Sequence, residues 1–353
     1  MNQEQILKLE ESIQKMRDKK SRIYFIVQDT KGNAKASIRY IYEMAMSLKN
    51  NGFNAIILHE TPEYFGVTDW LGEEYMTNLD HKSIEGTNLE ISPEDLIVIP
   101  EIYGFIMDQI TKLPCGKIVL SQSYDYIFET LQPGQTWTQL GFHKCITTSE
   151  KQKEYISSTM RSVSVDVIEP TISEVFEKQE FPPKTIIGVH TRDHRDTVNL
   201  IKTFYTKFPQ YRWITFRDLR GLSQVEFTNA MKESFASVWI DSISSFGTFP
   251  LESMKMGIPV IGLVPNITPE WMNEENGIWI NNQNMIVDVI ADFIQNWLED
   301  NLNPKLYEEM DITINKLSTK EKFESEVVEL FAKMIDTRAD SFEAQLSKLE
   351  TTE

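Results

Sequence analysis

The residues with the clearest chemical potential follow a short apolar run in the segment Trp239–Leu263, which reads WIDSISSFGTFPLESMKMGIPVIGL. The run ends at Ile240, a turn rich in serine and glycine follows, and apolar residues then recur at helical spacing. Pro250 suits the first turn of that helix, and Gly257 followed by Pro259 suits its end. Because the amide groups and the dipole at a helix start favour an anion, this segment predicts a phosphate or diphosphate site.

The residue types in this segment also suit a nucleoside attached to the phosphates. Gly247 permits close approach of the backbone to a ligand. Glu252, in the first turn of the helix, would repel phosphate but can accept two hydrogen bonds from a ribose diol. Taken alone, the turn is better explained as an ordinary strand-to-helix connection, whereas the full run with its ending MGIPVIG is more specific. The residues predicted to line the site are Asp241, Ser244, Ser245, Phe246, Gly247, Thr248 and Glu252.

A second group of polar residues, HTRDHRD, follows the apolar run TIIGV. Arg192 and Arg195 carry guanidinium groups, which bind phosphate oxygens in pairs, and ligands of parallel sheets bind where strands end. The alternative is a charged surface loop with internal ion pairs. His190 and His194 are four residues apart, but they form no helical zinc motif and no third ligand is evident, so we predict no metal.

Size and composition limit the classes of protein that fit. The chain has 353 residues, 41% hydrophobic and 25% charged, which favours two globular domains. A net charge of −18 argues against a nucleic-acid partner, which needs a basic face. The two cysteines, Cys115 and Cys145, lie outside metal and redox spacings, which indicates a reducing, cytoplasmic setting. The polar N-terminus predicts no secretory signal, and no apolar run approaches the roughly 20 residues that cross a bilayer.

Short apolar runs alternate with amphipathic segments along the chain, which predicts an α/β fold with parallel sheets. The proline-containing stretch Glu169–Lys184 is the expected linker, so we predict domains over 1–168 and 169–318 and a helical tail over 319–353 that frays from residue 337. The expected strands are Arg22–Gln28, Ala55–Leu58, Asp95–Pro100, Lys117–Leu120, Lys144–Thr147, Ser162–Ile168, Thr185–Val189, Arg212–Phe216, Ser237–Ile240, Pro259–Val264 and Asn276–Ile280. The expected helices are 1–20, Ile38–Leu48, Asp196–Phe208, Val225–Ser234, Pro250–Met256, Met285–Glu299, Pro304–Leu317 and Lys320–Asp336.

Other polar residues stand where strands are expected to end, at the edge where ligands of such folds bind. Each is explained equally well by a structural role. The candidates are Gly32, Asn33, Glu101 and Gln122 in the first domain, on the side of a second substrate, and Arg217 and Glu270 in the second domain, beside a base and a sugar.

A basic cluster closes the first expected helix. We interpret it as the solvated face of a docking helix, in preference to a contact with anionic lipid. The cluster consists of Lys15, Arg17, Lys19, Lys20 and Arg22.

The region from about Thr185 to Ile280 resembles the retaining GT-B glycosyltransferases of family 4, also called group 1. The signature of that family is an acidic residue, Gly-Phe-Gly, a second Glu eight positions after the first, and a helix followed by G-x-P-V. One departure is clear: Ser244 stands eight positions before Glu252, and the nearest acid, Asp241, lies three residues earlier. The positions that match are Phe246, Gly247, Pro250, Glu252, Met254, Gly257, Pro259 and Val260; the family's phosphate-binding Arg and Lys fall at His190 and Arg195.

The resemblance implies two Rossmann-like doubly wound domains with an interdomain cleft, the GT-B fold. It further implies a glycosyltransferase that moves a sugar from a nucleoside diphosphate sugar to an acceptor hydroxyl of a glycan, lipid-linked or protein substrate, with retention and without a metal or other cofactor. Arg192, Arg195 and Glu252 would be its catalytic residues, with the two arginines stabilising the leaving diphosphate. Ser244 supports an alternative, a noncatalytic subunit that binds sugar nucleotides. A sugar-nucleotide epimerase of similar shape is a further alternative.

Overall fold

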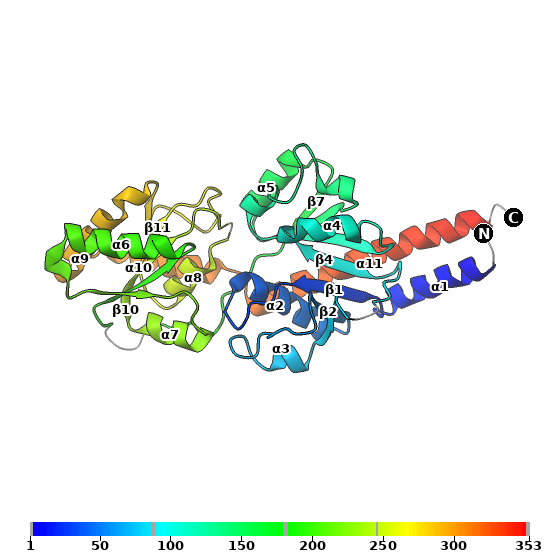
Figure 1. Ribbon diagram of the computed structural model, residues 1–353, viewed down its shortest axis with the longest axis horizontal. Helices are drawn as coiled ribbons and strands as arrows, with labels where there is room; N and C mark the ends of the chain where they lie inside the picture. The colour runs from blue at the N-terminus through cyan, green and yellow to red at the C-terminus, as the bar shows by residue number, and fades with distance from the viewer. Residues whose placement is uncertain (1–2, 87–88, 179–182, 245, 351–353) are drawn as a thin grey trace. The chain divides into compact units, whose positions relative to one another are not determined.

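The chain forms two compact units in the computed structural model, which describes residues 3–86, 89–178, 183–244 and 246–350 (Figure 1). The first unit comprises Met1–Thr148, Lys153–Glu169 and Thr319–Glu353, and the second comprises Ser149–Gln152 and Pro170–Ser318. The C-terminal segment therefore returns to the unit that contains the N-terminus. Within the described ranges, no helix is long and apolar enough to span a bilayer.

A parallel sheet of seven strands forms the centre of the first unit, in the order β3-β2-β1-β4-β5-β6-β7. The six strands predicted for this part of the chain are confirmed, with ends that shift by one or two residues. The seventh, β3, was not predicted, because its sequence DHKS contains no apolar run. The strands are β1 (Arg22–Val27), β2 (Asn54–His59), β3 (Asp80–Ser83), β4 (Leu96–Pro100), β5 (Gly116–Ser121), β6 (Lys144–Thr147) and β7 (Ser164–Val167).

Helices cover both faces of this sheet, because side chains of a strand point alternately to its two sides. Ile23 and Phe25 of β1 pack with α2 and α11 on one face. Tyr24 and Ile26 pack with α4 and α5 on the other. The helices of the unit are α1 (Gln3–Arg17), α2 (Ala36–Asn50), α3 (Glu74–Thr77), α4 (Gly104–Ile110), α5 (Glu150–Thr159) and α11 (Lys320–Glu350).

The first helix docks on the last one, which confirms the predicted docking helix. Ala339 of α11 is fully buried, and the helix continues without a break to Glu350. The prediction that the chain frays from residue 337 is therefore wrong for residues 337–350, because their acidic side chains meet a basic partner; residues 351–353 lie outside the described part. The ion pairs that join α1 to α11 run from Arg17 to Asp336, Asp340 and Glu343.

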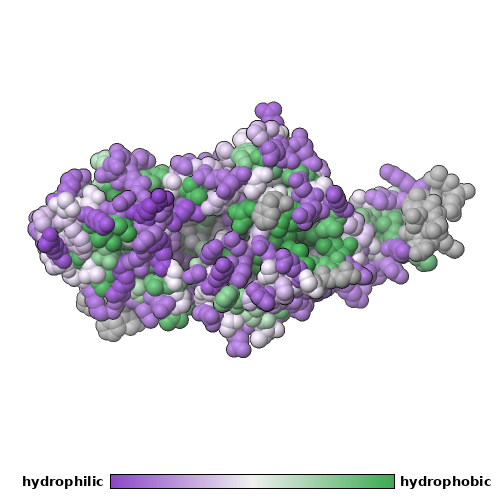
Figure 2. All heavy atoms as spheres, in the orientation of Figure 1, coloured by the Kyte–Doolittle hydropathy of each residue, from purple (hydrophilic) through white to green (hydrophobic). Residues whose placement is uncertain are grey.

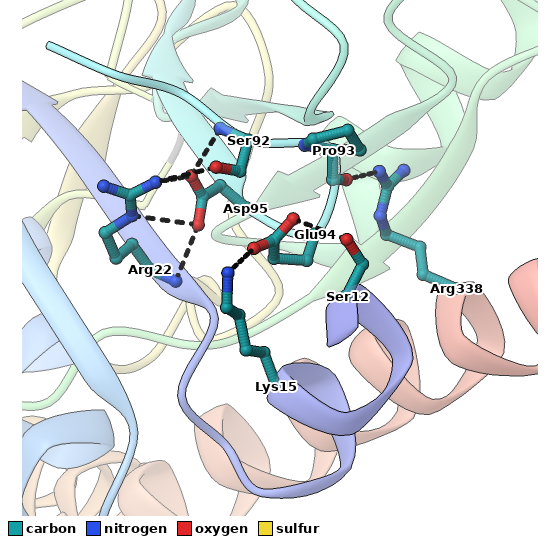
Figure 3. Close-up of polar contacts among 8 residues, drawn as sticks. All are labelled: Ser12, Lys15, Arg22, Ser92, Pro93, Glu94, Asp95 and Arg338. Carbon is teal, nitrogen blue, oxygen red and sulfur yellow. Dashed lines mark hydrogen bonds and ion pairs between the residues drawn. The ribbon is translucent and has the colours of Figure 1, made fainter. Parts of the chain in front are cut away.

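Two buried carboxylates before β4 connect the same helices to the sheet (Figure 3). Glu94, 3% exposed, accepts hydrogen bonds from Lys15 Nζ at 2.8 Å and Ser12 Oγ at 3.0 Å. Asp95, 1% exposed, accepts two from the Arg22 guanidinium, at 3.1 and 2.7 Å. Lys15 and Arg22, two members of the basic cluster, thus have intramolecular partners.

The second unit is built on a parallel sheet of five strands, in the order β12-β11-β10-β8-β9. All five had been predicted. Two strand starts were wrong by three residues. β9 begins at Thr215 and not at Arg212, because the segment Pro209–Tyr211 forms a 3₁₀ turn and Ile214 packs in the core. β10 begins at Ser234 and not at Ser237, because α7 already ends at Lys232. The strands are β8 (Ile186–Thr191), β9 (Thr215–Asp218), β10 (Ser234–Ile240), β11 (Val260–Leu263) and β12 (Ile278–Ile280).

Helices again cover both faces. On one face α6 and α9 pack around Val189 and Val238, and on the other α7, α8 and α10 pack around Trp239 and Val260. The helices predicted here are confirmed, with α8 beginning two residues before the expected Pro250. They are α6 (His194–Lys207), α7 (Gln224–Lys232), α8 (Thr248–Lys255), α9 (Ile286–Leu298) and α10 (Pro304–Lys316).

Candidate functional site

The strand order of the second unit gives a topological switch point at the carboxyl ends of β8 and β10. The chain leaves β8 for β9 on one side and then crosses to β10 on the other side of β8. Ligands of doubly wound sheets bind at such a switch point, outside the carboxyl ends of the strands. Arg192 follows β8 directly, and Asp241 follows β10 directly. The two segments singled out in the sequence therefore meet at one place.

Arg192 and Asp241 form a bidentate ion pair across the switch point. Arg192 Nε donates to Asp241 Oδ1 and Nη2 donates to Oδ2, each at 2.9 Å. The Asp241 side chain is 10% exposed, whereas the Arg192 side chain is 43% exposed. Asp241 also accepts a hydrogen bond from the Ile243 amide, which fixes the carboxylate. The geometry holds a guanidinium in one orientation at the solvent edge of the sheet.

His190 lies in β8 and stacks on Phe249 of α8, with ring centroids 4.8 Å apart. Its Nδ1 is buried and has no partner among the described residues. Burial lowers the pKa of His190 to about 4, so its ring is neutral at neutral pH. His190 therefore offers a neutral hydrogen-bonding group near the carboxyl end of β8.

The N-terminus of α8 completes this edge. Gly247 is the N-cap residue, in the left-handed conformation with φ 73° and ψ 67°, and Thr248 is the first helical residue. The Ser244 hydroxyl accepts a hydrogen bond from the Gly247 amide at 3.0 Å, so this serine stabilises the turn. Glu252 is half-buried on the same helix. The prediction that it lies in the first turn is wrong: because α8 begins at Thr248 and not at Pro250, Glu252 lies in the second turn. Ser245, also predicted to line the site, lies outside the described residues.

Phe246 contributes to packing rather than offering a polar group. Its side chain is 6% exposed within the core, and its carbonyl oxygen accepts the Trp271 indole N–H at 2.6 Å. Phe246 and Trp271 together hold the turn that leads into α8.

Arg195 lies in the first turn of α6, the helix that follows β8. Its side chain is 86% exposed and pairs with Asp193, the N-cap residue, at 2.9 Å. The charged loop thus contains an internal ion pair, and the same guanidinium stands in solvent at the carboxyl edge of the sheet.

Two other predicted residues do not join this group. Arg217 lies within β9 and not after it, and its guanidinium pairs with Glu233 at 2.7 Å. Glu233 directly precedes β10, so this contact lies at the amino edge of the sheet, opposite the switch point. Glu270 is exposed and accepts a hydrogen bond from the Lys151 amide.

Asp218 and Arg220 are polar residues at the carboxyl edge of the same sheet that the sequence reasoning missed. Asp218 ends β9 and hydrogen-bonds the Arg220 guanidinium and amide. They were missed because the predicted strand ended too early, at Phe216. The mixture of apolar and charged residues in FRDLR is the signal that would have placed them at a strand end.

In the first unit, the four predicted residues follow the ends of β1, β4 and β5, on both sides of a switch point between β1 and β4. Gly32 has φ 79°, and Asn33 next to it is exposed. Gln122 reaches the Ser37 carbonyl with its amide at 3.1 Å.

Glu101 is 2% exposed, so its carboxyl group supports the loops at this edge from within. Its Oε1 accepts the Gln122 and Ser123 amides at 2.8 and 2.7 Å. Burial raises the pKa of Glu101 to about 7, against the opposing effect of these two hydrogen bonds.

Comparison with known proteins identifies the fold. The sequence matches no protein-family profile and no curated protein sequence. Sucrose-phosphate synthase from Thermosynechococcus elongatus is similar in structure, with a TM-score of 0.61, 12% identity, and coverage of 90% of this chain and 100% of that one. The pneumococcal O-GlcNAc transferase GtfA, in complex with UDP and GlcNAc, has a TM-score of 0.58 and 10% identity, and the match covers 90% of this chain and 99% of GtfA. HepE from Anabaena, in complex with UDP-glucose, has a TM-score of 0.56 and 11% identity, and the match covers 88% of this chain and 99% of HepE.

The predicted fold class is therefore confirmed: the chain has the GT-B fold of these glycosyltransferases, with two Rossmann-like domains of parallel strands between helices. At 10–12% identity, the likeness defines the fold and leaves the reaction to the chemistry of the site.

Proposed function

We propose that this protein is a glycosyltransferase that moves a sugar from a nucleoside diphosphate sugar to an acceptor hydroxyl. The observation that carries the proposal is the Arg192–Asp241 pair at the switch point of the second unit, on a strand edge that packs against the start of α8. Glu252 lies one turn further along α8. A cation and a helix N-terminus suit a diphosphate, and a carboxylate beside them suits a ribose diol. The UDP and UDP-glucose named with two structural neighbours support a donor of this class.

The roles proposed for the residues follow from where charge develops. Breaking the bond between the sugar and the diphosphate places negative charge on the leaving phosphate oxygens. Arg192, Arg195 and the amides at the start of α8 stabilise that charge, and Glu252 orients the nucleoside. His190 and Thr248 hydrogen-bond the donor from β8 and α8. These cations and amides meet the diphosphate without a metal, so we propose metal-independent chemistry.

The finer features of the reaction rest on the family resemblance. We propose retention of the sugar configuration and membership of family 4, on the match from Phe246 to Val260. Gly32, Asn33 and Gln122 are proposed to face an acceptor, with Glu101 holding the loop that contains Gln122. A glycan, a lipid-linked sugar or a protein side chain would supply the hydroxyl. Few cysteines and acidic composition favour a cytoplasmic location.

One observation favours a second function, a noncatalytic subunit that binds sugar nucleotides. The family acid that contacts the donor sugar is replaced by Ser244, whose hydroxyl is engaged by the Gly247 amide. The nearest acid, Asp241, is held by Arg192. Under this alternative the donor binds without reacting.

Thermal stability with a panel of UDP-, GDP-, dTDP- and ADP-sugars tests the binding site. A ligand at about 100 times its Kd stabilises the native state by about 2.7 kcal/mol, so the correct base and sugar raise the melting temperature. Glu252→Ala and Arg195→Ala each abolish the increase, and Arg212→Ala, an exposed arginine of the same unit, leaves it unchanged. Equal increases in all three variants would show that the donor binds elsewhere.

Product analysis then separates the two functions. The purified protein with its best donor and an acceptor mixture releases nucleoside diphosphate if it is a transferase. Tight binding with no release of diphosphate over hours would favour the noncatalytic subunit.

A further inference from the structure

A cavity of about 250 Å³ lies in the first unit at the amino ends of β4, β5 and β6, walled by α11. This is the edge of the sheet opposite the loops that follow β1, β4 and β5. The cavity therefore belongs to neither the donor nor the acceptor side proposed above. Its lining residues from the sheet side are Leu96, Cys115, Gly116, Lys117, Ile118, Gly141, His143, Lys144 and Asp166.

The floor of the cavity is apolar. Leu96 and Ile118 come from the sheet and Met334 from α11, and all three are less than a tenth exposed. Hydrophobic side chains gather over the part of the first unit where β4 and α11 lie (Figures 1 and 2). An apolar cavity of about 150 Å³ already admits benzene. The floor here therefore suits a hydrocarbon group more than a sugar, which needs several polar partners.

The rim of the cavity is basic, in contrast to the chain as a whole. Lys144 and Lys333 are exposed at its opening, and Lys117 is half-buried. With Arg338 they make four cationic side chains against one carboxylate, Asp166, on a chain whose net charge is −18. Long basic side chains place their stems along apolar surface and their charges in solvent, which is the arrangement that an amphipathic anion needs.

Arg338 lines the cavity and extends from α11 to the loop before β4 (Figure 3). One of its Nη atoms donates to the Pro93 carbonyl, whereas its buried Nε has no partner among the described residues. The adjacent carboxylates are engaged by other groups: Glu94 by Lys15 and Ser12, and Asp95 by Arg22. A buried donor without an acceptor is costly, so an anionic ligand would supply the missing acceptor.

We propose that this cavity binds a single-chain amphipathic anion, with its acyl chain on the floor formed by Leu96, Ile118 and Met334 and its carboxylate or phosphate among Arg338, Lys117 and Lys333. A single free molecule in solution fits a volume of this size, whereas a bilayer surface does not enter it. The site is independent of the proposed donor site, so loss of one leaves the other intact.

Isothermal titration of the full-length protein with defined probes tests the proposal. Decanoate and decyl phosphate bind, decyltrimethylammonium binds at least tenfold more weakly, and sodium phosphate alone does not bind. Vesicles of anionic phospholipid do not bind the protein. Equal affinity for the cationic amphiphile, or binding to vesicles but not to free decyl anions, would overturn the proposal.

Variants on α11 connect the binding to the cavity. Leu330→Trp fills the space and Lys333→Glu reverses a rim charge, and each weakens decanoate binding at least tenfold. Lys320→Glu makes the same charge change at the start of the same helix, away from the cavity, and leaves the affinity unchanged. Thr337→Trp, at an exposed lining position, is the second filling variant should Leu330→Trp fold poorly. Unchanged affinity in a folded filling variant would show that decanoate binds elsewhere.

Discussion

Arg192 and Asp241 directly follow two neighbouring strands, and two hydrogen bonds of 2.9 Å join the guanidinium to the carboxylate at the ends of β8 and β10. The pair links the two segments that form the switch point and fixes the arginine where an anionic ligand of such a sheet binds. Because the arginine is the more exposed partner, it can contact a phosphate while Asp241 continues to orient it.

Replacing Arg192 by Ala is expected to weaken binding of the best sugar nucleotide at least tenfold, because a hydrogen bond to a charged group contributes about 1.5–3 kcal/mol. Titration calorimetry of the folded variant measures the change. Arg212→Ala removes an exposed guanidinium from the same unit and serves as the control. An unchanged Kd in Arg192→Ala would remove this arginine from the donor site.

Replacing Gly247 by Ala tests how closely the turn before α8 is packed, and the measured quantity is the free energy of unfolding. Its φ is 73°, and a Cβ atom there would lie 3.1 Å from Trp271 Cζ2 and 3.2 Å from Trp239 Cη2. Gly257, at the other end of α8, has φ 75°, but a Cβ there would meet only Lys178 Cγ, at 3.9 Å. Gly257→Ala is expected to cost about 1–2 kcal/mol from the left-handed conformation. Gly247→Ala should cost at least about 1 kcal/mol more, because two indole rings must move.

Urea denaturation of both glycine variants, followed by tryptophan fluorescence, measures the difference. Both positions flank one helix, so the comparison isolates packing from backbone strain. Equal destabilisation would mean that the tryptophans do not restrict the turn.

The order of strands and helices could be predicted from the sequence because each buried strand carries a continuous apolar run, such as RIYFIV in β1. The sequence assigned Arg192 and Asp241 to the segments after two of these strands, but their ion pair depends on the order of β8 and β10 in the sheet and was not predicted. The direction of Arg217 could not be predicted, because it depends on the distant Glu233. The length of α11 depended on Arg17, which is more than 300 residues away in sequence and pairs with its acidic face.

Glu101 is expected to make the first unit less stable as pH rises. Burial raises its pKa from 4.5 to about 7, so the folded chain keeps a proton that the unfolded chain has lost. The stabilisation of the folded state by protonated Glu101 is complete below pH 4.5 and is lost as pH rises through 7. The difference between the two pKa values corresponds to a change in the free energy of unfolding on the order of 3 kcal/mol. Glu101→Gln keeps an oxygen for the Gln122 and Ser123 amides but does not titrate.

The stability of Glu101→Gln relative to wild type should therefore increase between pH 4.5 and 7.5 in urea denaturation. Glu129→Gln, at an exposed position of the same unit, is the control. A constant difference across this range would contradict a protonated Glu101.

His59 is expected to make the first unit less stable as pH falls, the opposite of the effect of Glu101. His81 Nε2 donates to the Tyr75 carbonyl at 3.1 Å, so His81 Nδ1 accepts the proton on His59 Nε2, at 2.9 Å. The remaining His59 Nδ1 is buried without a partner among the described residues, beneath the stacked ring of Tyr64. Burial lowers the pKa of His59 from 6.5 to about 3, so only the unfolded chain binds a proton between these values.

The stabilisation by neutral His59 is thus complete above pH 6.5 and is lost as pH falls towards 3, by at most about 1.4 kcal/mol per pH unit. His59→Phe retains a ring against Tyr64 but loses the hydrogen bond to His81, so it is expected to be less stable than wild type at pH 7.5. Its free energy of unfolding should decrease less than that of wild type between pH 7.5 and 5. Urea denaturation at pH 5, 6 and 7.5 measures both effects, with exposed His143→Phe as control. A decline as steep in His59→Phe as in wild type would mean that other groups cause it.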